Sequence, residues 1–120
     1  KMMVASYLGG CAIATSYVGV VHPFSAALSV VLGLHHCVSN CITMRAMEEF
    51  YPHGYKEFWK MALHQNVDIP TGVCASLPDQ QYDDLFEAMI VHEKPLTNAL
   101  GDNFRRILTR DKAREMFEKM

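Results

Sequence analysis

Apolar residues recur at the three- and four-residue spacing of helices along nearly the whole chain. No stretch alternates between apolar and polar residues as a half-exposed strand would, and proline and glycine divide the helical pattern at regular intervals. We therefore expect an all-α fold, a bundle-like packing of about six helices in a single domain over residues 1–120. The expected helices cover about residues 2–20, 22–32, 35–51, 55–66, 79–92 and 110–120.

Individual residues mark where several of these helices begin and end. Gly33 suits the exit of the second helix. Thr109 is expected to cap the last helix, because a hydroxyl oxygen can accept a free backbone N–H of the first turn. For the same reason Ser76 is expected to begin the fifth helix and Asn103 a short turn. The stretch 95–101, bracketed by a proline and a glycine, is expected to be a loop.

Charged residues are almost absent from the first third of the chain. Lys1 is the only charged residue among residues 1–40, and all 13 acidic groups follow it. Residues 2–21 could span a membrane, form the inside of this domain, or form the inside of a larger protein of which the chain is a fragment. A start at Lys1 rather than Met fits a fragment. Small and polar residues dilute the segment and no basic cluster flanks it, so we expect a buried helix rather than a span.

Composition narrows the classes of function. The chain has 120 residues, half of them apolar, which is enough for one domain with a core. Its formal net charge of −2 argues against a nucleic-acid partner, because phosphate binding usually needs a surplus of basic residues. The 4 cysteines do not form the dense framework of a small secreted domain. We therefore expect reduced thiols and a cytoplasmic protein.

Three histidines, His22, His35 and His36, lie in the charge-free third. An imidazole in apolar surroundings needs a partner for its ring nitrogens, and several together point to a metal. Two histidines do not complete a metal site, so further ligands are required. A structural zinc site of His36, Cys37 and Cys41 is one alternative, although adjacent helical residues project about 100° apart. The simpler interpretation of the two cysteines is that they are small core residues.

Two segments resemble the metal-binding part of the iron-containing alcohol dehydrogenases. They are residues 19–23, Gly-Val-Val-His-Pro, and 33–40, Gly-Leu-His-His-Cys-Val-Ser-Asn. In that family a second ligand histidine follows the first after 14 positions, which is the spacing of His22 and His36. The resemblance continues to the end of the chain. Residues 92–101, His-Glu-Lys-Pro-Leu-Thr-Asn-Ala-Leu-Gly, are similar to the branch of 3-deoxy-D-manno-octulosonate 8-oxidases.

The resemblance implies that the chain is the C-terminal helical domain of a two-domain dehydrogenase, without its N-terminal α/β nucleotide-binding domain. One Asp and three His of the helical part hold a divalent metal, iron or zinc, in the family. This implies His22 and His36 as metal ligands, the other two lying upstream. The metal polarises a primary alcohol, such as that of a sugar acid, which is oxidised to an aldehyde as NAD(P) accepts the hydride. The candidate substrate residues are His35, His92, Thr97 and Asn98, and the catalytic residue is unknown.

One position departs from the family pattern, and one alternative function stays open. Many relatives carry another histidine four positions after the first matched ligand, where this chain has Ala26, so we assign no proton relay there. We expect the chain alone to be inactive and to form homo-oligomers through the surface that the missing domain would otherwise cover. Its expected partners are the missing domain and a small-molecule alcohol, without nucleic acid or membrane. The alternative is a non-enzymatic helical module, attached to a membrane through residues 2–21 or structured by zinc.

Overall fold

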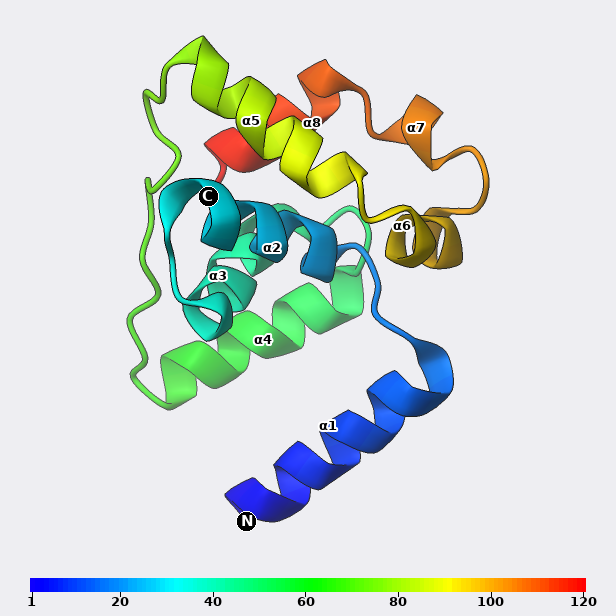
Figure 1. Ribbon diagram of the computed structural model, residues 1–120. Helices are drawn as coiled ribbons and strands as arrows, with labels where there is room; N and C mark the ends of the chain where they lie inside the picture. Colours follow the sequence, from blue (N-terminus) through cyan, green and yellow to red (C-terminus); the bar gives the residue numbers. More distant parts are fainter.

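The computed structural model describes all 120 residues and is helical throughout, without a strand (Figure 1). The all-α prediction is confirmed, with eight α-helices and one short 3-10 helix rather than about six helices. The elements are α1 (Met2–Ser16), α2 (Val21–Leu32), α3 (His36–Thr43), the 3-10 helix η1 (Met44–Ala46), α4 (Pro52–His64), α5 (Asp79–Ile90), α6 (Glu93–Leu100), α7 (Phe104–Ile107) and α8 (Arg110–Glu118).

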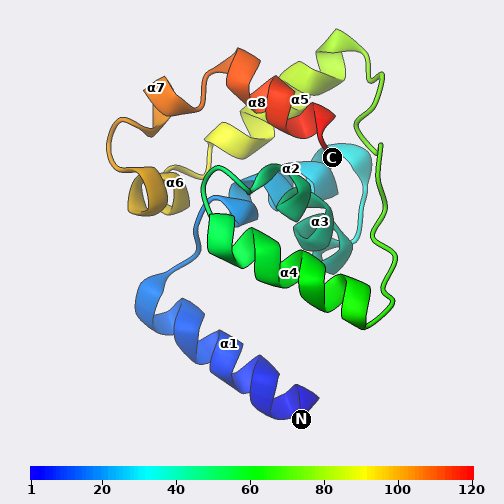
Figure 2. The ribbon, with the colours of Figure 1, turned by 180° about the vertical axis from the view of Figure 1, so that it is seen from behind.

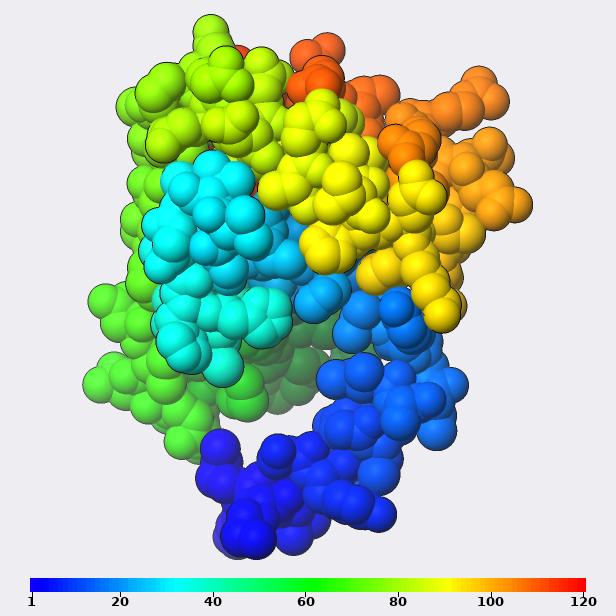
Figure 3. Space-filling view, viewed as in Figure 1, coloured from blue at the N-terminus to red at the C-terminus, as the bar shows by residue number.

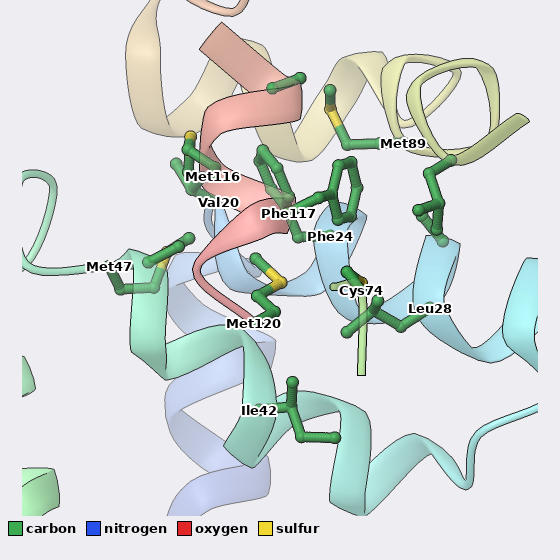
Figure 4. Packing of buried hydrophobic residues seen from close by; sticks show 14 of the residues in the cluster. Val20, Phe24, Leu28, Ile42, Met47, Cys74, Met89, Met116, Phe117 and Met120 are labelled. Carbon is green, nitrogen blue, oxygen red and sulfur yellow. The ribbon is translucent and has the colours of Figure 1, made fainter. Parts of the chain in front are cut away.

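The core lies around α2, which contacts α5 and α3, while α5 also contacts α8. Phe24 of α2 and Phe117 of α8 meet at the centre, with their ring centres 5.0 Å apart (Figure 4). The expected inward stripe of the last helix is confirmed, because Ala113, Met116, Phe117 and Met120 are all buried. Seen from behind, α4 lies across the lower part of this body beside α3 (Figure 2). We call residues 20–120 the body.

The first helix does not belong to this core. α1 extends away from the body (Figures 1 and 3), and none of its residues is buried. The prediction of a buried helix over residues 2–20 is therefore wrong in both its burial and its length. α1 ends at Ser16 because Tyr17 takes a positive φ of 67°, which breaks the helical path. Its side chains are uncharged, yet no other helix packs along it.

No helix of the chain is by itself long and apolar enough for a membrane span. Only α1 and α2 taken together reach the required length and hydropathy, and a bend of 110° separates them.

The third predicted helix, 35–51, is shorter than its apolar pattern suggests. α3 ends at Thr43 and continues only as the 3-10 turn η1 before the chain bends. Pro52 does not end this segment but starts α4, since the first turn of a helix does not need the N–H that proline lacks. The fourth helix accordingly begins earlier than the predicted 55–66 and ends before Asn66, which has a φ of 52°.

The stretch 95–101 is a helix rather than the expected loop. α6 holds Pro95 in its first turn, where proline is tolerated, and Gly101 follows its last residue with a φ of 78°. Together with α7, this helix accounts for the elements beyond the predicted six.

The predicted caps are confirmed at two of four positions. The Thr109 hydroxyl accepts a hydrogen bond from the Lys112 backbone N–H at 3.3 Å, and Gly33 has the left-handed φ of 68° after α2. Ser76 does not cap α5, because its own φ of 59° places it in a turn before Pro78, the residue that precedes the helix. Asn103 precedes α7, but its side chain forms no cap hydrogen bond.

Candidate functional site

The start of α2, which carries His22, is fixed by a contact from outside the helix. The Val20 N–H donates a hydrogen bond to the Tyr51 hydroxyl at 3.0 Å. A side chain at Gly19 would collide with that hydroxyl, so glycine permits the close approach. Inside the first turn, the Ser25 hydroxyl donates to the His22 carbonyl at 3.0 Å. These contacts fix the backbone position of His22, the second residue of α2.

α3 is held against α2 at a fixed register. The Ser29 hydroxyl of α2 donates to the Ser39 hydroxyl of α3 at 3.1 Å, and Ser39 is buried. His36 is the first residue of α3 and therefore has a defined place opposite the start of α2. His35 precedes the helix, and its Nδ1 accepts a hydrogen bond from the Cys37 N–H at 3.4 Å. That cap gives His35 a local role, while its predicted contact with substrate stays a prediction.

Three imidazoles from three parts of the fold meet at this point. The ring centres of His22 and His36 are 5.7 Å apart, and those of His22 and His92 are 5.4 Å apart. Both neighbours stand edge-on to the His22 ring at 78°. We call His22, His36 and His92 the histidine cluster. It lies at the surface, with His22 and His92 half-buried and His36 exposed, rather than in the dry pocket that the sequence suggested.

The electrostatics of the cluster favour a neutral His22. Burial lowers the pKa of the His22 imidazole, and the neighbouring positive charges that His92 and His36 can carry lower it further. A neutral imidazole keeps a free nitrogen lone pair, which is the form that binds a metal. The His22 ring makes no hydrogen bond within the chain, so both of its nitrogens are available.

The separation of the His22 and His36 rings can be compared with that of two imidazoles on one metal ion. Two imidazoles on one tetrahedral zinc, with Zn–N bonds of about 2.0–2.1 Å, have ring centres roughly 5 Å apart, close to the spacing seen here. Imidazole also suits iron. No group of three or more His, Cys, Asp or Glu side chains is arranged to hold a metal ion. The alternative zinc site of His36, Cys37 and Cys41 is therefore not formed, and any further ligands for the pair have to come from outside the chain.

A groove opens between the end of α1 and α6. Its volume is about 500 Å³, and its walls are Tyr17, Glu93, Lys94, Thr97 and Asn98. The Asn98 amide donates to the Ser16 carbonyl at 3.3 Å, which ties the end of α1 to α6. Two of the candidate substrate residues, Thr97 and Asn98, thus share one groove, and the chain runs from this groove directly into His92.

The family resemblance implied that His22 and His36 lie close together, and they do. It gave no sign that His92 would contact His22, because this contact depends on how α5 returns the chain to the start of α2. The sequence signal for this contact would have been a helix that begins at Glu93, directly after His92. The prediction that residues 95–101 form a loop left this helix out. No model of a known protein family matches the chain.

Proposed function

We propose that the chain is the metal-binding helical part of an iron-type alcohol dehydrogenase that oxidises a primary alcohol to an aldehyde. His22 and His36 supply two ligands of a divalent iron or zinc ion. The remaining two ligands belong to an upstream stretch of the helical part, and the NAD(P) site belongs to an N-terminal nucleotide-binding domain; these 120 residues contain neither. The chain alone is therefore an incomplete enzyme.

One observation carries this proposal: His22 and His36 come from two different helices, and their ring centres are 5.7 Å apart. This separation is close to that of two imidazoles bound to one metal ion, which supports a cation shared between the two rings. The lowered pKa of His22 supports the same interpretation, because the ring is ready to bind without losing a proton first.

A bound iron or zinc ion would supply Lewis-acid polarisation of an alcohol oxygen. His22 and His36 would hold this ion, each through one ring nitrogen. The groove of Tyr17, Lys94, Thr97 and Asn98 would hold the rest of the alcohol. The Thr97 hydroxyl makes no hydrogen bond within the chain and is free to bind a substrate hydroxyl.

Metal titration of the 120-residue chain tests the proposal. We expect Co²⁺, followed by its visible absorption, to bind one equivalent weakly through His22 and His36. His22→Ala and His36→Ala should each weaken this binding at least tenfold, because each removes half of the available ligands. His53→Ala and His64→Ala are matched controls, since both histidines are exposed on α4 away from the cluster. Equal losses in all four variants would contradict the proposal.

A second candidate function is favoured by the exposed α1. α1 is fully exposed and has no charged residue, so it can withdraw apolar surface from water by entering a lipid phase, and this would make the chain a non-enzymatic attached module. Co-flotation of the chain with phosphatidylcholine vesicles would support this candidate, provided that Leu8→Lys abolishes it. A chain that stays in the soluble fraction under the same conditions would eliminate it.

A further inference from the structure

No hydrogen bond orients the His22 side chain. Metal-binding histidines usually donate their second ring N–H to a carboxylate or a backbone carbonyl, which fixes the ring orientation. The His22 ring has no such partner within the chain. Its neighbours are the His36 ring on one hand and the His92 ring on the other, both edge-on at 78°. Edge-to-face contact is a preferred arrangement of two aromatic rings, because the positive edge of one faces the negative face of the other.

The His92 ring is available to pack on His22 because it forms no hydrogen bond within the chain. It occupies the position before α6, yet it forms no side-chain cap hydrogen bond. Its place is set by the backbone: the His92 N–H donates to the Met89 carbonyl at 3.3 Å, and the Leu96 N–H donates to the His92 carbonyl at 3.3 Å. Changing the ring therefore leaves the caps and the backbone hydrogen bonds of this turn in place.

The geometry points to His92 as a positioning residue that holds the His22 ring for metal binding by edge-to-face packing, without itself being a ligand. This inference rests on the proposed function for its purpose, but the packing role stands on the ring geometry alone. The three rings together are not arranged to hold one metal ion, so His92 does not join His22 and His36 as a third ligand. An aromatic ring of similar width at position 92 should be able to replace it.

Two substitutions separate packing from coordination. His92→Phe keeps an aromatic edge but has no nitrogen, whereas His92→Ala removes the ring. We expect His92→Ala to weaken Co²⁺ binding about tenfold, the usual loss for a residue that orients a metal ligand. His92→Phe should stay within about threefold of the unchanged chain. Val91→Ala, an exposed neighbour, is the matched control and should have no effect.

A metal-free measurement keeps this inference separate from the proposed function. The order parameter of the His22 ring C–H groups, measured by NMR relaxation without metal, should be high in the unchanged chain and in His92→Phe, and lower in His92→Ala. A His22 ring equally ordered in all three proteins would overturn the positioning role, whatever the metal does. Equal loss of Co²⁺ affinity in both variants would overturn it in favour of coordination by His92. Ordered rings without any Co²⁺ binding would instead refute the proposed function and leave the packing role intact.

Discussion

α1 and α2 are both free of charged residues, yet only α2 is buried. α2 places Phe24, Ala27 and Leu28 on one face and buries all three in the core. α1 exposes every residue, including Leu8 at 60% and Ile13 at 55% of their surface. The two helices are separated by only a short bend, so their different fates reflect their own sequences and their neighbours rather than their place in the chain.

The distribution of large side chains explains the difference. In α2 they gather on one side and give the helix a single buried face. In α1 apolar residues surround the helix evenly, with Gly9 and Gly10 in its middle, so no face is preferred. A lack of charge alone therefore does not predict that a helix is buried. Only a stripe of large side chains predicts which neighbours will cover it.

The contrast between the two regions is tested most strongly by a substitution that leaves a cavity at the centre of the body. Phe117→Ala removes the ring that packs on Phe24, and we expect it to lower the free energy of unfolding by about 3–5 kcal/mol, because a large ring is lost from a filled core. Urea denaturation followed by circular dichroism measures this change. A loss below about 1 kcal/mol would mean that the two rings do not share one core.

A smaller effect concerns the buried thiol of the body. Burial raises the pKa of Cys74 to about 11. The unfolded chain releases this proton from about pH 9 upward while the folded chain keeps it, so stability should be complete below pH 9 and fall as the pH rises to 11. The expected loss from this group is about 2 kcal/mol. Cys74→Ala should flatten the profile relative to Cys11→Ala, whose thiol is exposed, and identical slopes would show that Cys74 is not buried.

The smallest expected effect lies in α1. Leu8→Ala should change the free energy of unfolding by less than about 0.5 kcal/mol, because the side chain has no buried contact to lose. The same denaturation experiment measures it. A cost comparable to that of Phe117→Ala would place α1 in a packed interface and remove the contrast between the two regions.

The sequence was sufficient for the features that local chemistry decides. The helical periodicity, the left-handed exit at Gly33 and the cap at Thr109 each depend on a few neighbouring residues, and all three are present. Features that depend on distant parts of the chain were missed. The early end of α3 and the exposure of α1 were both missed, because the apolar pattern continues beyond Thr43 and an all-round apolar helix was expected to be buried.

The site shows the same division. The close approach of His22 and His36 was expected from the family resemblance, which pairs two ligand histidines 14 positions apart. The contact of His92 with His22 depends on where α5 and the turn before α6 lie in the fold, so the sequence could not predict it. In the proposed function, the identity of the metal, the alcohol and the hydride acceptor is decided by residues outside these 120, so no local pattern here could predict it.

The most direct test of the central claim, that His22 and His36 share one metal ion, is a Zn²⁺ titration of the chain followed by ¹⁵N NMR of its imidazole nitrogens. We expect the signals of these two histidines to change together and to saturate at one equivalent, while those of His53 and His64 stay in place. If the two signals change independently, or only the α4 histidines respond, the two rings do not form a common site.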